Sequence, residues 1–340
     1  MLHRFIYGLC CLALLGFVCQ KVWKEVSFSP QTVMEVPHAH EQHLDGSGVI
    51  VAVLDEGFDH SHSALKDKMS PYRYNTNNNT RDVSETIVFE NGQYAFESHG
   101  THVSGIISSL APQVNIIPIK IGGFGGDQAF VKALQIATSS PAHIVNISMR
   151  LSHTGREISP NVRTALIRLA NAGKLIVIAA GNDGAPLMQN AYTASLVELA
   201  HDPLMDARLL LAGASSYKNG SESLAEFSNY PGNNAFGIAQ TYFITAPGEQ
   251  ITSAITGGFF GEKSGTSMAA PMVVGAASLL KQAFSNLQAE DIALLLLTSA
   301  RKISLDGKDL PRKYFGAGIV NLKSALEQGR MTSLKLNWNG

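Results

Sequence analysis

The sequence predicts an α/β protein in which helices cover both faces of a mostly parallel central sheet. The first observation is the run from Gly48 to Leu54, which is apolar without alternation, as in strands buried on both faces. The second is that further strand-like runs alternate with segments of helical periodicity. Connections of one helix between successive strands give parallel pairing, with helices on both sides of the sheet.

The length and charge of the chain limit its classes of function. Its 340 residues suffice for one large α/β domain, and 45% hydrophobic with 16% charged residues indicate a globular chain. The 26 basic and 27 acidic residues give a formal net charge of −1, without any block of like charge. We therefore expect no nucleic-acid partner. We also expect the protein to be a monomer.

The first 19 residues differ in kind from the rest. His3 and Arg4 precede an apolar run over residues 5–18. This run is shorter than the ~20 residues of a membrane span and is typical of a signal-peptide core. Residues 1–19 are therefore interpreted as a signal peptide or a short signal anchor. We expect an exported protein, secreted or associated with the cell envelope, with residues 5–18 as a membrane tether if the leader is retained.

Candidate metal ligands are few. All three cysteines lie in the leader, so the remaining chain has no disulfide, no cysteine metal ligand and no cysteine nucleophile. Residues 20–46 form a short polar arm that contains His38, His40 and His43. These histidines could bind a metal, but no other ligand-rich stretch accompanies them, which favours a solvated arm. The sequence predicts no metal site and no required cofactor.

The remaining elements follow in order. Strands are predicted at residues 114–119, 144–148, 174–179, 207–212 and 241–245, and helices at residues 127–137, 161–172 and 289–299. Residues 66–97 are interpreted as a surface excursion with one short strand at Thr86–Phe89. No repeat or linker interrupts the chain after residue 47. We therefore expect one catalytic domain over residues 47–328 and a C-terminal tail over residues 329–340.

Two polar side chains follow buried strands. Asp55 ends the strand that begins at Gly48, and Asn182 follows the strand at residues 174–179 within a glycine-containing turn. The carboxyl ends of parallel strands meet at one edge of the sheet, where open α/β folds place their ligand sites. Asparagine is also common in turns for conformational reasons, so the meaning of Asn182 depends on its partners.

A histidine pair begins a predicted helix after residue 98. His99 and His102 lie one helical turn apart, among small residues that allow close helix packing. Two histidines at this spacing could bind zinc, but no glutamate stands between them as in an H-E-x-x-H motif. We therefore interpret His99 as functional and His102 as structural.

A serine lies in the first turn of a predicted buried helix. Ser267 follows Gly265 in a tight turn and precedes an apolar run with helical spacing that continues to Leu280. The free N–H groups and the positive dipole end of a helix N-terminus favour developing negative charge. For Ser267 alone, a capped helix that happens to start with serine remains the alternative.

Taken together, these residues supply every role in acyl transfer. Ser267 would attack as the nucleophile, and His99 would take its proton and return it to the leaving amine. Asp55 would hold the imidazole in the required tautomer and stabilise the imidazolium. Asn182 and the backbone N–H of Ser267 would donate to the oxyanion.

Four segments around these residues resemble the signatures of the subtilisin-like serine proteases. They are V-A-V-L-D-E-G, S-H-G-T-H-V-S-G, I-A-A-G-N-D-G and S-G-T-S-M-A-A-P-M-V-V-G. The order Asp, His, Ser is also that of subtilisin. The resemblance covers residues 44–328 and implies a three-layer subtilisin-like fold and a serine endopeptidase. It makes Asp55, His99 and Ser267 the triad and Asn182 the oxyanion donor. The alternative is a catalytically silent subtilase fold that binds peptides, but a binding role would not need all four residues.

The resemblance also assigns residues to substrate binding: Gly125, Gly126, Ser148, Met149, Arg150, Ala180, Gly181 and Asp183. Arg150 stands where the family usually has glycine in its S-x-G-G wall of the pocket, and adds bulk and charge. Our hypothesis is that Arg150 and Asp183 face each other across the groove and narrow or polarise it. The alternative is that Arg150 extends harmlessly into solvent.

The glycine-rich loop at residues 122–126 is not a phosphate cradle, because no Lys-Ser/Thr pair follows it. The resemblance makes it an edge that pairs with the substrate backbone, so an extended peptide or protein substrate is implied. Glu56 replaces the usual Ser or Thr after the catalytic Asp, but adjacent strand residues point to opposite faces, so it need not touch His99. Ala64 stands at the family's usual calcium-ligand position, which leaves structural calcium only elsewhere.

Overall fold

The central sheet is built of parallel strands. In the computed structural model, which describes residues 29–338 except 91–92, 123–125, 153–155, 219–220, 234–236, 306–307 and 310–311, the strand order is β10-β8-β7-β6-β1-β5-β2. The strands are β1 (Ile50–Asp55), β2 (Tyr74–Asn75), β5 (Asn115–Lys120), β6 (Ile144–Ile147), β7 (Leu175–Ala179), β8 (Leu209–Lys218) and β10 (Phe243–Pro247). All six neighbouring pairs are parallel, and β9 (Ser221–Leu224) joins β8 antiparallel. The predicted mostly parallel sheet is confirmed.

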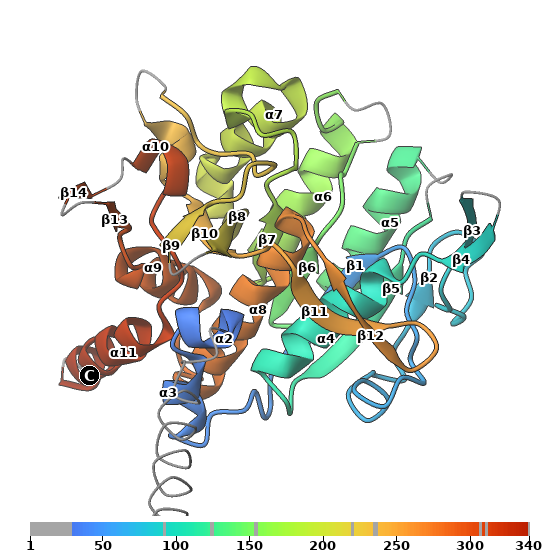
Figure 1. Cartoon of the computed structure of the whole chain (residues 1–340), viewed down its shortest axis with the longest axis horizontal. Coiled ribbons are helices and arrows are strands. Elements are labelled where there is room, and N and C mark those ends of the chain that lie inside the picture. The colour runs from blue at the N-terminus through green and yellow to red at the C-terminus, as the bar shows by residue number, and fades with distance from the viewer. Residues whose placement is uncertain are drawn as a thin grey trace, which may run out of the picture.

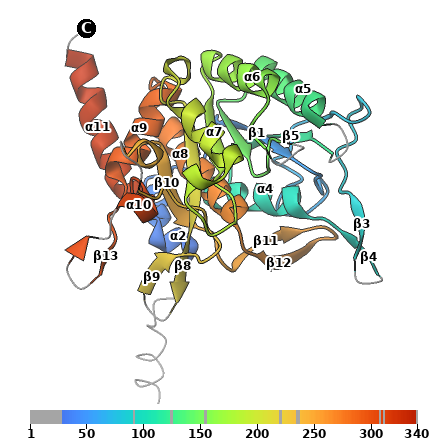
Figure 2. The ribbon, with the colours of Figure 1, turned by 90° about the horizontal axis from the view of Figure 1, so that it is seen from above.

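Helices cover both faces of this sheet (Figure 1). The larger ones are α4 (His99–Leu110), α5 (Gly126–Ser139), α6 (Pro160–Asn171), α7 (Ala191–Ala200), α8 (Thr266–Ala283) and α9 (Ala289–Ser299). Strand β1 shows how the layers form. Val51 and Val53 pack into the cluster that contains α4, α8 and α9, whereas Ala52 and Leu54 pack into the cluster that contains α5, α6 and α7. Figure 2 shows β1 and β5 between α5 and α6 on one side and α4 on the other.

Helix α8 is the centre of one layer. Every residue from Gly265 to Leu280 is buried except Ser267, which is half-buried. A helix that is apolar on all sides belongs in the core, and Ser267 is the point at which the N-terminal part of this helix reaches the surface. Gly275 allows α8 to approach α4, since a Cβ at this position would lie 2.7 Å from Cβ of Leu110. Within the described residues, no helix is both long and apolar enough to cross a membrane.

Several elements differ from the predicted ones or were not predicted. Strand β8 continues six residues past the expected end at residue 212 because its end pairs with β9. The expected short strand at Thr86–Phe89 is β3 (Ile87–Glu90), which pairs with β4 (Gln93–Phe96). A hairpin of β11 (Ile251–Ile255) and β12 (Phe259–Lys263) leads into α8. Its aromatic residues Phe259 and Phe260 are exposed, so β12 lacks the buried apolar run by which the other strands were recognised.

The described part of residues 20–46 is not the solvated arm that we expected. Its helices α2 (Pro30–Val33) and α3 (Val36–His40) pack onto the domain, and Met34, Val36 and Ala39 are fully buried. Nε2 of His40 lies 2.8 Å from the carbonyl oxygen of Leu110, which gives this histidine a structural partner. The polar composition of the arm concealed three apolar residues at its core-facing positions.

Short elements complete the fold: the 3₁₀ helices Leu187–Gln189, Pro203–Met205 and Ile238–Gln240, the strands β13 (Ser304–Leu305) and β14 (Lys308–Asp309), and the helices α10 (Arg312–Phe315) and α11 (Leu322–Trp338). Helix α11 packs against α3 and α9. The expected start of the tail at residue 329 therefore falls inside a helix. The expected leader, residues 1–19, lies outside the described residues.

Candidate active site

A hydrogen bond between two side chains joins the end of β1 to the start of α4. Nδ1 of His99, the first residue of α4, lies 2.7 Å from Oδ1 of Asp55, the last residue of β1. The same oxygen accepts a hydrogen bond from the backbone N–H of Glu56 at 2.8 Å. Asp55 is fully buried and His99 is partly exposed. The carboxylate therefore fixes the imidazole so that Nε2 remains available to a reacting group.

The electrostatics of this pair make His99 a stronger base. Burial alone would lower the pKa of His99, but the charge of Asp55 and its hydrogen bond outweigh burial and raise this pKa above its ordinary value. Glu56 acts in the same direction, and Lys263 opposes it. Glu56 itself is half-buried, and burial together with the charge of Asp55 raises the pKa of its carboxyl.

Ser267 lies at the same edge of the sheet. In β1 and β6, Leu54 pairs with Ile147, so Asp55 and Ser148 directly follow this pair on strands whose axes are ~4.8 Å apart. The hydroxyl of Ser267 donates to the carbonyl oxygen of Ser148 at 2.9 Å, and the hydroxyl of Ser148 donates to the carbonyl oxygen of Ser267 at 2.9 Å. Among the described residues, no hydrogen bond joins Ser267 Oγ to His99. The hydroxyl therefore lies at the sheet edge that carries the Asp55–His99 pair and points to Ser148.

The third strand end at this edge carries Asn182. Oδ1 of Asn182 accepts hydrogen bonds from the backbone N–H of Thr266 at 2.8 Å and from its hydroxyl at 2.9 Å. The Thr266 hydroxyl also accepts from the backbone N–H of Gly181. Because these donors occupy the carbonyl side of the amide, its N–H₂ side is directed away from them. Gly181 has φ +101°, and a Cβ there would lie 2.5 Å from Asn229, so this turn requires glycine.

Thr266 was missed by the sequence analysis, although it directly precedes the proposed nucleophile. A threonine at the first position of a helix is usually interpreted by its effect on the helix terminus. Here its hydroxyl bridges two other segments, Gly181 and Asn182, and thereby orients the amide. The signal in the sequence was the position of Thr266 between Gly265 and Ser267.

A cavity of about 230 Å³ adjoins Ser267. Its described lining consists of Ser148, Met149, Arg150, Ala179, Gly181, Asn182, Asp183, Tyr192, Thr266 and Ser267. The structure thus brings five of the eight predicted substrate residues to the same cavity as Ser267. Ala180 is buried beside the cavity and is not part of this lining. Gly126 begins α5 and is also absent from the described lining, and Gly125 lies outside the described residues.

Arg150 and Asp183 do face each other in this cavity. Nη2 of Arg150 lies 3.7 Å from Oδ2 of Asp183, and both side chains are partly exposed. The guanidinium also stacks over the ring of Tyr192, and Cζ of Arg150 lies 4.9 Å from the centroid of this ring. The two side chains therefore face each other as we expected, although Arg150 remains exposed to solvent, and the narrowing or polarising of the groove by this pair stays a prediction. The aromatic support from Tyr192 was not foreseen.

His102 has the structural role that we expected. It is fully buried, and its Nε2 donates to the carbonyl oxygens of Ile251 at 2.9 Å and Gly261 at 3.1 Å. These two contacts fasten the β11–β12 hairpin to α4. Burial lowers the pKa of His102 to about 4, so the imidazole is neutral at pH 7.

A second carboxylate braces the start of α4. Glu85 accepts hydrogen bonds from the hydroxyl of Thr101 and from the backbone N–H of Ser98, the residue before His99. Burial raises the pKa of the Glu85 carboxyl, which the Thr101 hydroxyl opposes. The sequence analysis placed Glu85 in a surface excursion, and only the fold shows that this excursion returns to the site.

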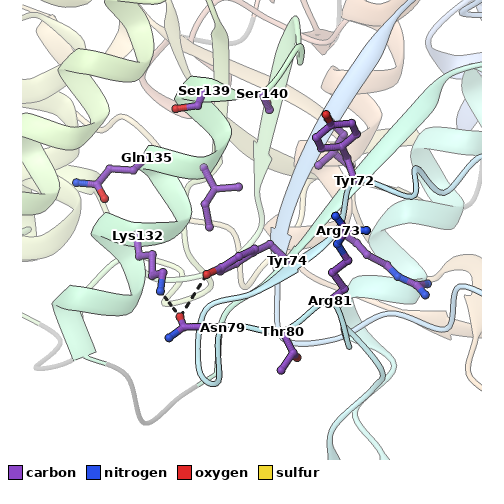
Figure 3. Close-up of a pocket in the computed structure, with 12 residues that line it drawn as sticks. Tyr72, Arg73, Tyr74, Asn79, Thr80, Arg81, Lys132, Gln135, Ser139 and Ser140 are labelled. Atoms are coloured by element: carbon purple, nitrogen blue, oxygen red, sulfur yellow. Dashed lines mark hydrogen bonds between the residues drawn. The ribbon is translucent and has the colours of Figure 1, made fainter.

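A larger cavity lies on another flank of the molecule. It has about 630 Å³ and lies between β2 and α5, lined by Tyr72, Arg73, Tyr74, Asn79, Thr80, Arg81, Ile117, Lys132, Gln135, Ile136, Ser139 and Ser140. Figure 3 shows the side chains of Tyr74 and Lys132 meeting at Asn79. Its described lining includes hydroxyl groups but neither a histidine nor a carboxylate. This cavity lacks the base that nucleophilic catalysis by a hydroxyl requires.

The position expected for a calcium ligand does not fit a cation. The carbonyl oxygen of Ala64 accepts hydrogen bonds from the ammonium of Lys68 and the hydroxyl of Ser108. Calcium prefers several carboxylate and carbonyl oxygens, and an ammonium at this oxygen competes with a metal. Among the described residues, no group of three or more His, Cys, Asp or Glu side chains could hold a metal ion.

Comparisons with known proteins agree with this geometry. The model of the subtilase family matches residues 46–318. Subtilisin Savinase from Lederbergia lenta is 29% identical over 307 residues, which cover 86% of this chain and 96% of that protein. Subtilisin E from Bacillus subtilis (strain 168) is 28% identical over 310 residues, which cover 86% of this chain and 70% of that protein.

Solved structures share the fold. Fervidolysin from Fervidobacterium pennivorans, a keratinolytic enzyme related to subtilisin, has a TM-score of 0.66 and 25% identity over 85% of this chain. The chain spans 44% of the length of that structure. A cold adapted subtilisin-like serine proteinase has a TM-score of 0.62 and 24% identity, over 82% of this chain and 90% of that one. The three-layer subtilisin-like fold is thereby confirmed, and the chain belongs to the subtilase family of serine-type endopeptidases.

Proposed function

We propose that Ser267, His99 and Asp55 hydrolyse peptide bonds through an acyl-enzyme, with Asn182 as the oxyanion donor. The observation that carries the proposal is the edge formed by β1, β6 and β7. It carries the hydrogen-bonded Asp55–His99 pair, a hydroxyl at the start of α8 and an amide of fixed orientation. These groups are the base, its orienter, the nucleophile and the anion donor that acyl transfer needs.

In the acylation step, the Ser267 hydroxyl turns from Ser148 to Nε2 of His99 and transfers its proton there. Oγ attacks the carbonyl carbon of the substrate, and the carbonyl oxygen becomes an oxyanion. This oxyanion accepts hydrogen bonds from the Asn182 amide and from the backbone N–H of Ser267, which has no partner within the first turn of α8. His99 then gives its proton to the leaving amine as the C–N bond breaks, and an ester remains on Ser267.

In the deacylation step, His99 takes a proton from water, and the hydroxide attacks the ester carbonyl. The second oxyanion uses the same donors, and the C–O bond to Ser267 breaks as Oγ recovers its proton from His99. Asp55 keeps its negative charge throughout and stabilises the imidazolium in both steps. All groups in these steps belong to the chain and water, so the proposed mechanism requires no cofactor.

A fluorophosphonate probe tests the nucleophile directly. The purified protein should be labelled at Ser267, and labelling should be lost in Ser267→Ala. Ser278→Ala is the matched control, since Ser278 lies on the same helix and its hydroxyl donates within that helix to Val274. Labelling that persists in Ser267→Ala would contradict the assignment. Folded wild-type protein that takes up no probe and cleaves no peptide would instead favour the catalytically silent, peptide-binding alternative.

We also propose that the protein is exported and acts as a monomer on extended peptide or protein substrates. The apolar run at residues 5–18 supports export. N-terminal sequencing after cell fractionation tests it: a start after residue 19 supports a cleaved leader, and an intact chain in the membrane fraction supports a tether. The molar mass in solution can be measured by light scattering. A mass at or below 36.4 kDa, the mass of the full chain, supports a monomer, and twice this mass contradicts it.

A further inference from the structure

We propose that Arg150 makes this enzyme select substrates with an acidic side chain, glutamate or aspartate, immediately before the scissile bond. This inference rests on the proposed function of Ser267. It concerns the cavity of about 230 Å³ that the catalytic residues share with Arg150. No part of it depends on the larger cavity between β2 and α5.

The cavity receives the side chain on the acyl side of the bond. Ser267 and Asn182 belong to its lining, together with Arg150, Asp183 and Tyr192. The carbonyl carbon that Ser267 attacks must lie beside Oγ, with its oxygen towards the Asn182 amide. The side chain carried by the same residue is then the part of the substrate nearest to the cavity. A charged group in the cavity lining therefore interacts more strongly with this substrate side chain than with the other side chains of the substrate.

Arg150 is held in this cavity by its surroundings. Its guanidinium stacks over the ring of Tyr192, which is almost completely buried. The Tyr192 hydroxyl accepts a hydrogen bond from the backbone N–H of Leu151 at 2.9 Å, so the ring is itself fixed. Cation–π contact and a planar guanidinium suit a rigid, oriented site for a carboxylate. In the described lining of the cavity, Arg150 is the cation and Asp183 the anion.

Asp183 is the carboxylate of the protein itself with which a substrate carboxylate would compete for Arg150. Its Oδ2 lies 3.7 Å from Arg150 Nη2, longer than the ~2.8 Å of a charge-assisted hydrogen bond, and both groups are more than a third exposed. Such a pair is weak. Asp183 also has a partner of its own, because the Asn229 amide donates to Oδ2 at 3.1 Å and accepts from the Asp183 backbone N–H at 3.0 Å. A substrate carboxylate can therefore compete with Asp183 for the guanidinium of Arg150 while Asn229 continues to hold Asp183.

Other side chains fit this cavity less well. A lysine or arginine side chain would place a second positive charge beside Arg150. A large apolar side chain would displace water from the guanidinium without offering it a hydrogen bond, and desolvation of a charge is costly. A carboxylate instead can make two parallel hydrogen bonds to the planar guanidinium. The chemistry of the lining thus favours an acidic residue.

Four fluorogenic peptides that differ only in the residue before the scissile bond, as Glu, Gln, Leu or Lys, test the inference. We expect kcat/KM of the wild type for Glu to exceed that for the isosteric Gln about tenfold or more, and the difference to shrink with added salt. Arg150→Met should abolish this preference and raise cleavage after Leu. Asp183→Asn, which keeps an oxygen for Asn229, should raise cleavage after Glu several-fold. Arg163→Met is the matched control, because Arg163 lies on α6, pairs with Asp202 and is absent from the described lining of the cavity, so the profile should be unchanged.

The outcomes separate the inference from the proposed function. If fluorophosphonate labels Ser267 and peptides are cleaved, but Gln or Leu equals Glu and Arg150→Met changes nothing, the inference is overturned and the proposed function stands. A preference for Lys would overturn it as well and make Asp183 the selecting group. If correctly folded wild type neither reacts with the probe nor cleaves any peptide, both fail together.

Discussion

The hydroxyl of Ser267 donates to the main-chain oxygen of Ser148, and the hydroxyl of Ser148 donates back to the main-chain oxygen of Ser267, each at 2.9 Å. This reciprocal pair fastens the start of α8 to the end of β6. It also directs the proposed nucleophile away from His99, so that χ1 of Ser267 must move to another staggered position before attack. Catalytic hydrogen bonds often form fully only in the complex with substrate, which agrees with this resting arrangement.

The orientation of the Asn182 amide should matter for the chemical step. Asn182→Leu removes an oxyanion donor and should lower kcat about 10²- to 10³-fold with little change in KM. Thr266→Val should lower kcat by a smaller factor, because it loses the hydroxyl that orients Asn182, and Thr266→Ser should restore it. Steady-state kinetics of the three variants check this. An unchanged kcat in Asn182→Leu would exclude this residue from the oxyanion site.

The activity should fall at low pH through His99. The base must be neutral, and Asp55 raises the pKa of His99 above the ordinary 6.5, so the acid limb of kcat/KM should lie above pH 6.5. In Asp55→Asn, the limb should shift to lower pH, while activity at pH 8 should drop by up to about 10⁴-fold. Profiles from pH 5 to 9 test both changes. A limb that stays in place would separate Asp55 from the base.

His102 should make the fold sensitive to acid. Its pKa is about 4 in the folded protein and 6.5 ordinarily, so the unfolded chain binds a proton first as the pH falls. The contribution of His102 to the free energy of unfolding is fully present above pH 6.5. As the pH falls towards 4, the free energy of unfolding decreases by ~3 kcal/mol through this group. Urea unfolding at pH 7 and pH 4.5 in a Ser267→Ala background, which prevents self-digestion, measures it. His102→Gln should remove most of the difference, and an equal loss in that variant would contradict the assignment.

Glu85 should support His99 as a hydrogen-bond acceptor and not as a charge. Glu85→Gln removes the cost of a buried carboxylate, whose pKa is raised in the fold, and should leave stability at pH 7 unchanged or higher. Glu85→Ala leaves the Ser98 N–H and the Thr101 hydroxyl without their partner and should cost ~1–3 kcal/mol. It should also lower kcat, because Ser98 precedes His99. Glu41→Ala, at an exposed position, is the control. Equal losses in Glu85→Gln and Glu85→Ala would show that the charge is required.

The layers of the fold and the four proposed catalytic residues could be predicted because each has a local signal. Strands β1 and β7 are apolar throughout since both of their faces are buried. Asp55 ends one such strand, Asn182 follows the other, and Ser267 lies in the first turn of a helix that is buried as far as Leu280. These signals depend on neighbouring residues in the chain, so one sequence suffices to detect them.

The contacts that orient the site could not be predicted in the same way. Thr266 meets Asn182, Asn229 meets Asp183, and Tyr192 supports Arg150, and each contact joins segments more than 40 residues apart in the sequence. A polar side chain can bond to many partners, and only the packed layers decide which one it meets. Sequence patterns also missed the buried face of α2 and α3, where three apolar residues are scattered among polar ones.

Helix α8 carries Ser267 and also fills the centre of its layer, packing against α4, β6, β7 and β8. The ribosome delivers Asp55 and His99 long before this helix, and domains tend to begin folding from the N-terminus during synthesis. The nascent chain therefore contains the proposed base and its carboxylate while it still lacks the proposed nucleophile. Because the same helix completes the core, the chain becomes able to cut only when it has itself become compact enough to resist cutting.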